Sequence, residues 1–254
     1  MGAVYGFVGD VDQSYLAQMR ERLQHRGSVV REWSPARSVC FGELRVAETR
    51  EHNRPEFPLA ANLALYNRDD IARKLASDGA PADAYTLLYE LLRLHGPHYL
   101  EHLNGDFALA LWDDDRQQLT LARDPLGVCP LYYYYRPDLI AFASEYKALL
   151  VLPGVDVEPD LAALQQLQDS KYLAPEATLI RSIHQAPAGE FLTIRNNTVS
   201  SQRFWDVEIQ PQAISKEQAE EGLREHFFQA IERRLDGMNP IGIELSGGID
   251  SAAI

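Results

Sequence analysis

The chain has 254 residues, with 24 Lys and Arg against 37 Asp and Glu, which gives a formal net charge of −13. This length accommodates one large domain, or one domain and part of a second. The acidic balance argues against nucleic acid as a partner, because binding to the phosphate backbone needs a basic face. Cys40 and Cys129 are too few for a disulfide framework, and no segment is long and apolar enough to cross a membrane. The sequence therefore predicts a cytoplasmic protein with neither a nucleic-acid nor a membrane partner.

The first part of the chain alternates short apolar runs with helical patterns. β-Branched and aromatic residues predict a strand at residues 3–9, directly at the N-terminus. The spacing of apolar residues over 16–23 predicts a helix. Two further strands are predicted at 39–46 and 59–66.

A capped helix and several hairpins are predicted next. Asp83 is placed to accept hydrogen bonds from the first turn of a helix. The predicted hairpin of 107–112 and 119–122 has an acidic turn, Asp113–Asp115, which we interpret as solvated, with a metal site as the alternative. Helices interspersed with strands predict an α+β layered domain over residues 1–206, and its remaining expected strands are 131–135, 140–143, 191–194 and 198–201.

A second region is predicted after residue 206. Residues 207–215 are interpreted as a linker, and Ser215 with Gln218 forms a capping box, in which each side chain satisfies a backbone amide. A strand is predicted over 241–245, within the start of an α/β domain at 216–254. The helix before that strand carries one apolar stripe: Ala219, Leu223, Phe227, Ile231 and Leu235.

A glycine loop, Ser246-Gly247-Gly248-Ile249-Asp250-Ser251, follows the predicted strand. Gly247 and Gly248 let the backbone approach an anion, toward which the amides of the loop and of the coming helix point. Ser246 and Ser251 can donate hydrogen bonds to a phosphate, and Asp250 can hold a Mg²⁺ that binds it. No Lys follows the glycines, so the loop is not of the Walker type. We interpret it as a pyrophosphate-binding loop, with a simple glycine turn as the alternative.

The loop resembles the Ser-Gly-Gly-x-Asp-Ser loop of the ATP pyrophosphatase family, whose members activate a carboxylate as its adenylate and release pyrophosphate. Other motifs along the chain resemble, in the same order, those of the asparagine synthetase family. The resemblance implies a four-layer αββα N-terminal nucleophile hydrolase-like fold, joined to the first helix and strand of a truncated ATP pyrophosphatase domain. The motifs are His25-Arg26-Gly27, Tyr66-Asn67, Asn104-Gly105-Asp106-Phe107-Ala108, Ala122-Arg123-Asp124-Pro125-Leu126-Gly127, Pro130-Leu131-Tyr132-Tyr133, Ala143-Ser144-Glu145-Tyr146-Lys147-Ala148-Leu149, Ala186-Pro187-Ala188-Gly189 and Phe204-Trp205.

In that family the glutaminase nucleophile is a Cys exposed by removal of Met1, and its own α-amine serves as the base. The corresponding residue here is Gly2, and no Ser, Thr or Cys occurs before Ser14. Cys40 and Cys129 are predicted to be packing residues. The resemblance therefore implies a degenerate glutaminase site without a catalytic nucleophile.

The other glutamine-site positions are partly retained. By resemblance, Arg45 grips the substrate carboxylate, Asp83 its amine, and Asn62 provides the oxyanion-hole side chain. The physical alternatives are a surface charge on an edge strand for Arg45 and a helix cap for Asp83. The family's next two residues, a Gly and an acid, are replaced by Leu63 and Ala64, and we expect the larger side chain to crowd the pocket. We predict that the chain does not hydrolyse glutamine.

One further motif suggests a metal. His98, Glu101 and His102 match the zinc-peptidase string H-x-x-E-H, in which two His can share a helix face. Gly96-Pro97 comes directly before them and no third ligand is evident, so we interpret the segment as structural, with a zinc site as the alternative.

The resemblance implies an ATP-dependent, amide-forming ligase. ATP and Mg²⁺ would activate a small-molecule or peptide carboxylate, which an amine or ammonia then attacks. Without the Cys, the amine is free ammonia or part of the substrate itself, as in β-lactam synthetases and lasso-peptide cyclases, which resemble this family. A different alternative is that the chain is a non-catalytic scaffold or a dimerisation fragment, which would form a homodimer. This alternative arises because residues 216–254 are near the lower limit of length for independent folding. The chain's end, three residues after the loop, suggests a truncated synthetase domain.

Overall fold

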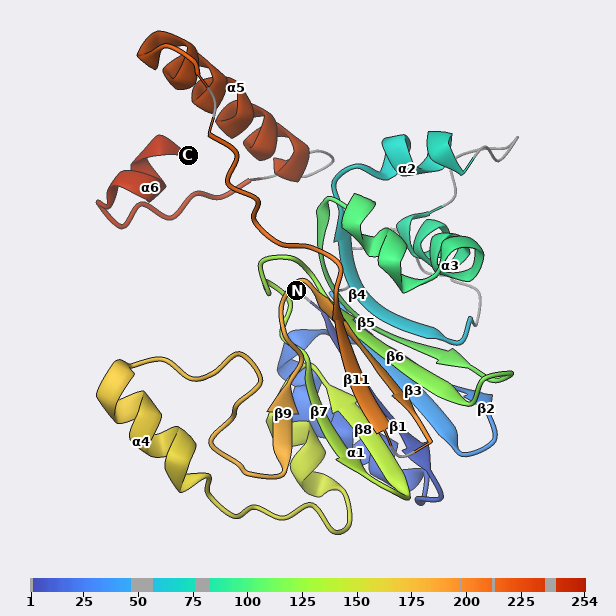
Figure 1. The fold of residues 1–254 in the computed structure, drawn as a ribbon. Helices are drawn as coiled ribbons and strands as arrows, with labels where there is room; N and C mark the ends of the chain where they lie inside the picture. The colour runs from blue at the N-terminus through green and yellow to red at the C-terminus, as the bar shows by residue number, and fades with distance from the viewer. Residues whose placement is uncertain (1, 47–56, 76–82, 197, 212, 236–240) are drawn as a thin grey trace. The chain divides into compact units, whose positions relative to one another are not determined.

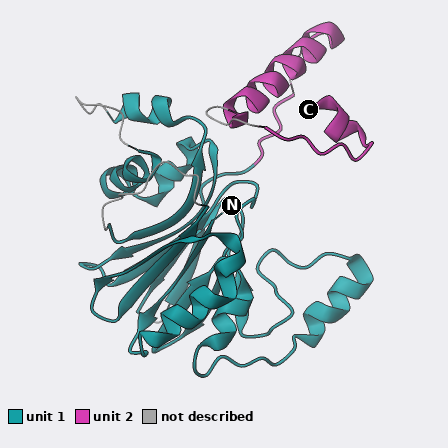
Figure 2. Ribbon diagram, turned by 180° about the vertical axis from the view of Figure 1, so that it is seen from behind, with its two compact units in different colours: residues 1–206 teal, residues 207–254 magenta. Residues whose placement is uncertain are grey.

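The computed structural model describes residues 2–46, 57–75, 83–196, 198–211, 213–235 and 241–254. They form two compact units, Met1–Asp206 and Val207–Ile254 (Figure 2). None of the described helices is long and apolar enough to cross a membrane.

Two antiparallel sheets form the body of the first unit (Figure 1). One sheet has the order β2-β3-β1-β8-β7-β9, with β1 (Ala3–Gly9), β2 (Val29–Ala36), β3 (Val39–Arg45), β7 (Tyr132–Arg136), β8 (Leu139–Ala143) and β9 (Ile183–Gln185). The other has the order β11-β10-β6-β5-β4, with β4 (Leu59–Leu65), β5 (Gly105–Asp113), β6 (Gln118–Arg123), β10 (Glu190–Arg195) and β11 (Thr198–Arg203).

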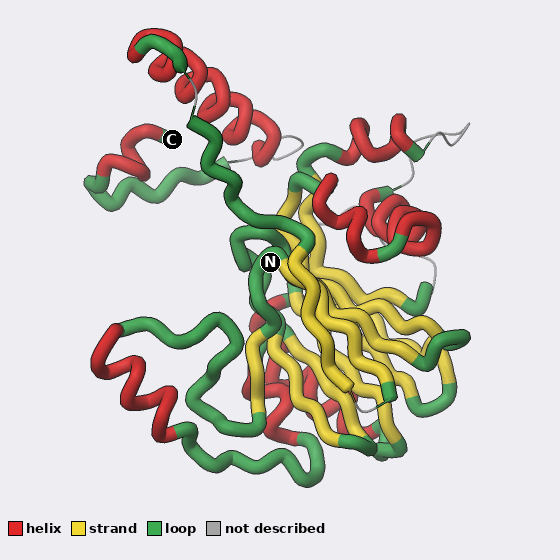
Figure 3. The backbone as a smooth tube through the Cα atoms, in the orientation of Figure 1, coloured by secondary structure: helices red, strands yellow, loops and turns green. Residues whose placement is uncertain are grey.

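The helices lie on the outer faces of the two sheets, so that the unit has four layers (Figure 3). The first sheet is covered by α1 (Ser14–Leu23) and by the 3₁₀ helix η3 (Tyr146–Val151). The second is covered by α2 (Arg68–Lys74), α3 (Ala84–His95) and the 3₁₀ helix η2 (Pro97–His102). The short 3₁₀ helix η1 (Gln24–Arg26) extends α1, and α4 (Leu161–Ser170) buries only Ala163. This is the αββα sandwich that the sequence predicts.

The buried side chains divide into three cores that correspond to the spaces between the layers. Apolar residues of both sheets, such as Phe41 and Leu121, fill the space between them. A second core lies between the first sheet and α1, and a third between the second sheet and α3. Successive strand residues point to opposite faces, so Val4 of β1 belongs to the central core and Tyr5 to the α1 side.

β1 is a central strand, because it pairs with β3 on one side and with β8 on the other. Its first residue, Ala3, lies opposite Leu44, while Tyr5 lies opposite both Gly42 and Ala143. The start of the chain is thereby fixed in the middle of a sheet rather than at its edge.

Most of the predicted elements of the first unit are confirmed. The helix at 16–23 buries Leu16, Met19 and Leu23, and the hairpin of β5 and β6 forms around the acidic turn. Among the described residues, the sequence analysis missed two strands, β2 and β9, two α-helices, α2 and α4, and the 3₁₀ helices η1 and η3.

The second unit contains α5 (Lys216–Leu235) and the short α6 (Ile249–Ala253). The predicted capping box is confirmed: the Ser215 N–H donates to Gln218 Oε1 at 3.0 Å, and the Gln218 N–H donates to Ser215 Oγ at 3.3 Å. The strand predicted at 241–245 is wrong, because these residues are irregular and exposed. A strand is stabilised by pairing with a neighbour, and the described residues of 207–254 contain none.

Candidate functional site

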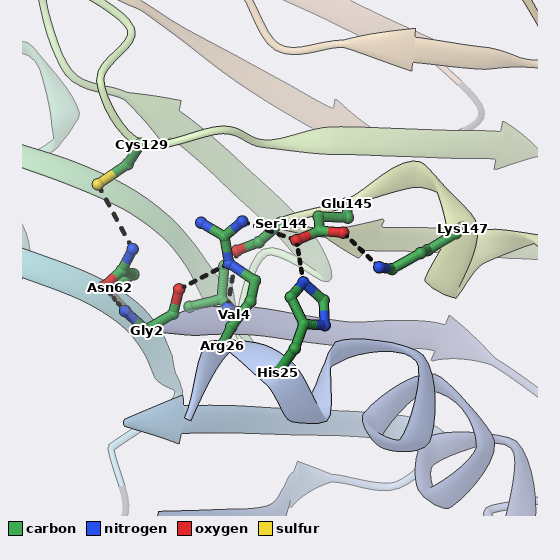
Figure 4. Close-up of polar contacts among 9 residues, drawn as sticks. All are labelled: Gly2, Val4, His25, Arg26, Asn62, Cys129, Ser144, Glu145 and Lys147. Atoms are coloured by element: carbon green, nitrogen blue, oxygen red, sulfur yellow. Dashed lines mark hydrogen bonds and ion pairs between the residues drawn. The ribbon is translucent and has the colours of Figure 1, made fainter. Parts of the chain in front are cut away.

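The candidate site is at the start of β1, where Gly2 is held through both of its backbone polar groups (Figure 4). Its N–H donates to Oδ1 of Asn62 at 3.2 Å, and its carbonyl oxygen accepts from Nε of Arg26 at 3.1 Å. Asn62 comes from β4 of the second sheet, whereas Arg26 follows α1 in η1. Residue 2 is therefore fixed between the two sheets, although it carries no side chain.

Asn62 also contacts Cys129, so its amide bridges the N-terminus and a thiol (Figure 4). Its Nδ2 donates to Cys129 Sγ at 3.4 Å. Burial, together with the negative charges of Asp124 and Asp106, raises the pKa of the Cys129 thiol to about 12. The thiol is therefore protonated near neutral pH and only 4% of the residue is exposed, as expected of a packing residue and not of a nucleophile.

The loop that carries Cys129 is organised by the buried carboxylate of Asp124. Asp124 Oδ2 accepts from the N–H of Cys129 at 2.9 Å, and Oδ1 accepts from the N–H groups of Leu126 and Val128. The guanidinium of Arg123 donates from Nε to the Cys129 carbonyl at 2.8 Å. These contacts fix the backbone at Cys129, whose thiol contacts Asn62.

A side chain at residue 2 does not fit the described backbone. A Cβ atom added to Gly2 overlaps the backbone carbonyl oxygen of Leu44 and lies 3.1 Å from Asn62 Oδ1. The overlap is with backbone of the neighbouring strand, which cannot move aside as a flexible side chain can. Residue 2 thus has no side chain, and the described backbone leaves no room for one.

A cluster of charges around Glu145 supports the same end of β1 (Figure 4). Glu145 Oε1 contacts Arg26 Nη1 at 2.7 Å and His25 Nε2 at 2.8 Å, and Oε2 contacts Lys147 Nζ at 2.9 Å. Burial acts to raise the pKa of Glu145, but hydrogen bonds from Lys147, Arg26 and His25 outweigh it and lower the pKa to about 2. Next to Glu145, the hydroxyl of Ser144 accepts from the N–H of Val4 at 2.9 Å.

The two residues expected to grip glutamine lie at the ends of different elements. Arg45 ends β3, which lies between β2 and β1, and the residue is only 9% exposed. The alternative of a surface charge on an edge strand is therefore wrong. Asp83 caps α3: Oδ1 accepts from the N–H groups of Tyr85 and Thr86, both at 3.0 Å, and Oδ2 accepts from the Thr86 hydroxyl at 2.6 Å.

The expectation that Leu63 crowds the glutamine pocket is not supported. Leu63 packs with the core between the second sheet and its helices, whereas Asn62 points toward Gly2 and Cys129. Neighbouring strand residues face opposite sides of a sheet, so the larger side chain points away from the site. Ala64 is exposed.

The two metal alternatives involve residues that have other contacts. His98 lies edge-on against Phe191, and His102 lies against Tyr99, so the two imidazoles face different aromatic partners. In the acidic turn, Asp113 accepts hydrogen bonds from Arg116 at 3.0 and 2.6 Å. Within the described ranges, no group of three His, Cys, Asp or Glu side chains could hold a metal ion.

The glycine loop of the second unit brings its two serines together. Ser246 Oγ and Ser251 Oγ are 3.0 Å apart, and the N–H of Gly248 donates to Ser246 Oγ at 3.3 Å. Gly247 has a φ of 79°, which favours glycine, and Gly248 is the N-cap of α6. Asp250 lies in the first turn of that helix.

The layered fold, with residue 2 at the start of a central strand, is that of the class II, N-terminal nucleophile-type amidotransferases. Glutamine phosphoribosylpyrophosphate amidotransferase from B. subtilis, solved with ADP and GMP, aligns with a TM-score of 0.57 over 80% of this chain and 49% of its own. A structure described as the allosteric regulatory enzyme of purine biosynthesis aligns over the same shares with a TM-score of 0.58. Both are 19% identical in sequence and show the fold alone.

Sequence comparisons define the family. A model described as a glutamine amidotransferase domain matches residues 1–205, and one described as asparagine synthase matches residues 222–254. The chain belongs to the asparagine synthetase-like family of glutamine amidotransferase domains.

Curated relatives of this family are considerably longer than the chain. Asparagine synthetase [glutamine-hydrolyzing] 3 of Bacillus subtilis is 31% identical over 98% of this chain and 44% of the relative. Amidase chry2 of Gibberella zeae is 31% identical over 66% of this chain and 25% of the relative. The chain thus spans less than half the length of these relatives.

Sequence reasoning missed part of the cluster around Gly2. Arg26, Glu145 and Lys147 were recognised only as motif residues, and the contact of Arg26 with Glu145 joins residues 119 positions apart. One signal could have found them: the motif over 25–27 carries a positive charge at Arg26, and the motif over 143–149 carries a negative charge at Glu145. The approach of Cys129 to Asn62 has no such signal.

Proposed function

We propose that the chain is the N-terminal part of an ATP-dependent, amide-forming ligase of the asparagine synthetase type, with a glutaminase-like domain that does not hydrolyse glutamine. One observation carries the second half of this proposal: residue 2 is held in place by Asn62 and Arg26, yet it has no nucleophile. Cys129 does not replace the nucleophile, because its thiol is buried and its pKa is raised.

Arg45, Asn62 and Asp83 are proposed remnants of a glutamine site. The amide of Asn62 is partly engaged, since its oxygen accepts from Gly2 and one of its two N–H groups donates to Cys129. The carboxylate of Asp83 is engaged as a helix cap. Of the three, only Arg45 lies on a strand adjacent to β1, one residue beyond Leu44, the partner of Ala3.

The loop from Ser246 to Ser251 is the proposed binding site for the phosphates of ATP. Its donor set fits an anion: the two hydroxyls converge beside the Gly248 amide, and Gly247 is open on its Cβ side. Asp250 is the residue that would hold Mg²⁺, which neutralises phosphate charge when it is bound. Mg²⁺ commonly takes one or two protein carboxylates plus phosphate oxygens, and this arrangement offers one.

Loss of the nucleophile favours a ligase whose amine does not come from glutamine. Free ammonia or an amine within the substrate itself, as in β-lactam synthetases and lasso-peptide cyclases, would make a glutaminase unnecessary. A scaffold or homodimerisation fragment is the non-enzymatic alternative.

Two measurements on the purified chain test the proposal. Glutamate release from glutamine is expected to remain at the level of a buffer blank, and turnover above it would overturn the inactive site. Calorimetric titration of this chain with ATP and Mg²⁺ is expected to show weak binding or none, because the described part of residues 216–254 holds only the loop and two helices of the proposed domain. Tight binding would overturn this view of an incomplete site. In the complete protein, Asp250→Asn is expected to weaken Mg²⁺-dependent ATP binding, and absence of ATP binding there would favour the scaffold alternative.

A further inference from the structure

A cleft of about 360 Å³ lies beside the Glu145 cluster in the first unit. This volume is within the range of small-molecule sites, roughly 300–1,000 Å³. The lining combines two aromatic rings with an ion pair, and the residues are Pro130, Tyr132, Ser144, Glu145, Tyr146 and Lys147.

A second hollow of about 190 Å³, lined mostly by apolar residues, shares Tyr132 and Tyr146 with the first. The two rings meet edge to face, with centroids 5.7 Å apart and an interplanar angle of 80°. Leu173, Leu179 and Ile180 contribute most of the remaining apolar wall. Both hollows are bounded by the same pair of rings and therefore adjoin there. We call them together the Tyr132–Tyr146 cleft, with a charged end at Lys147 and an apolar end at Ile180.

The charged end has an excess of positive charge. Arg26 and Lys147 both pair with the single carboxylate of Glu145, so one positive charge remains even when His25 is neutral. Lys147 has three N–H donors, of which Glu145 takes one among the described residues, and its side chain is 44% exposed. Both oxygens of Glu145 are occupied by cations, so the carboxylate has little left to offer an amine.

We propose that the Tyr132–Tyr146 cleft binds a small amphipathic carboxylate, whose head group pairs with Lys147 and whose apolar body lies against the two tyrosine rings and the Leu179–Ile180 wall. A ligand with an uncharged head group would not pair with Lys147. A small carboxylate without an apolar body would not make the apolar contacts. Glu145 and Lys147 belong to the charge cluster next to β1, but the cleft contains neither Gly2 nor the proposed glutamine-site remnants, and it lies outside the loop of residues 246–251. The inference therefore depends neither on ATP binding nor on glutamine hydrolysis.

Ligand binding by the full chain tests the inference, with 4-phenylbutyrate as the probe and calorimetry or saturation-transfer NMR as the readout. We expect saturable binding of 4-phenylbutyrate, and binding at least about tenfold weaker for the uncharged 4-phenylbutyramide, because a hydrogen bond to a charged group is lost. Lys147→Gln is expected to remove this preference for the carboxylate, and Lys147→Arg to keep it. Tyr146→Ala is expected to weaken both probes.

Lys74→Gln is the matched control, because Lys74 is an exposed lysine of the same unit on α2, on the other sheet's helix layer. This control should change the affinity by less than about twofold. Thermal unfolding of each variant shows whether it is folded, and the comparison of the two probes on the unmodified chain does not depend on any variant. Equal affinity for acid and amide, an unaffected Lys147→Gln variant, or no saturable binding of 4-phenylbutyrate would each overturn the proposal.

Discussion

The side-chain oxygen of Asn62 accepts a hydrogen bond from the backbone N–H of Gly2 at 3.2 Å, so that β4 of one sheet holds the residue directly before β1 of the other. In the family that this chain resembles, the same residue pair would be an oxyanion-hole donor and a nucleophile. Because residue 2 has no side chain here, we expect the contact to be structural, and this can be tested.

Removal of the Asn62 side chain is expected to destabilise the first unit. Asn62→Ala breaks the hydrogen bonds to Gly2 and Cys129 and leaves partly buried polar groups unsatisfied, which costs about 1–3 kcal/mol. Urea unfolding measures the change in the free energy of unfolding. Asn104→Ala is the matched control, because that side chain is exposed, and it should change stability by less than about 0.5 kcal/mol. Equal effects of the two substitutions would contradict the structural role.

Restoring the family's cysteine is not expected to restore activity. In a Gly2→Cys variant that has lost Met1, the new Cβ meets the carbonyl oxygen of Leu44, so the strands must shift before the thiol can be placed. We expect no glutamate release above that of the unmodified chain. Gly2→Ala introduces the same Cβ without the thiol and should destabilise the chain by about 1–3 kcal/mol. Glutaminase turnover by Gly2→Cys would show that the site is open.

Both cysteines are expected to be unreactive in the folded chain. Burial raises the pKa of Cys40 and that of Cys129, the latter to about 12, and the two residues are 2% and 4% exposed. Ellman's reagent at pH 8 should therefore detect both thiols only after denaturation, because the thiolate is the reacting form. Rapid reaction of one thiol in the native chain, located by mass spectrometry, would show that this region opens readily.

The Glu145 cluster predicts a pH dependence of stability with a definite sign. The pKa of Glu145 is about 2 when folded and lies below the unfolded value near 4.5, so the unfolded state binds the proton more strongly. The contribution is present above about pH 4.5 and is lost as the pH falls toward 2. Glu145→Gln should therefore lower stability most at pH 6, and its difference from the unmodified chain should shrink toward pH 2. A difference that is constant with pH would mean that the carboxylate charge does not matter.

Two substitutions of Asp83 test whether its carboxylate acts only as the N-cap of α3. Asp83→Ala is expected to lower the free energy of unfolding by about 0.5–2 kcal/mol, and Asp83→Asn by much less, because Asn is also a good N-cap. The measurement is thermal or urea unfolding of the two variants. If Asn and Ala destabilise equally, the negative charge of Asp83 matters beyond the cap.

Sequence predicts best those elements that have a regular repeat of apolar residues and a cap or turn residue at one end. The helix after Asp83 has its cap and four buried leucines, and the β5–β6 hairpin has a polar turn. β2 was missed because it is an edge strand with charged residues and Pro35, and β9 because it has only three residues. The strand expected at 241–245 has the right composition, but composition cannot supply a pairing partner.

The candidate site could be predicted only in part. Gly2 was identified by its place in a family pattern, and Asn62 by the same resemblance. That the amide of Asn62 contacts both Gly2 and Cys129 depends on how the two sheets pack, across separations of 60 and 67 residues. The direction of Leu63 follows from strand alternation once the register of β4 is known, and the sequence alone does not fix that register.

The central position of β1 has a consequence for how the first unit is made. β1 is synthesised first, but one of its two neighbours, β8, is complete only at Ala143. Until then the strand can pair only with β3, and its other edge stays open for most of the unit's synthesis. Such long-range pairing slows folding, and an open apolar edge invites pairing with other chains. Nascent chains that stop before Leu139 are therefore expected to need chaperones, while chains that extend past Ala143 can close this edge themselves.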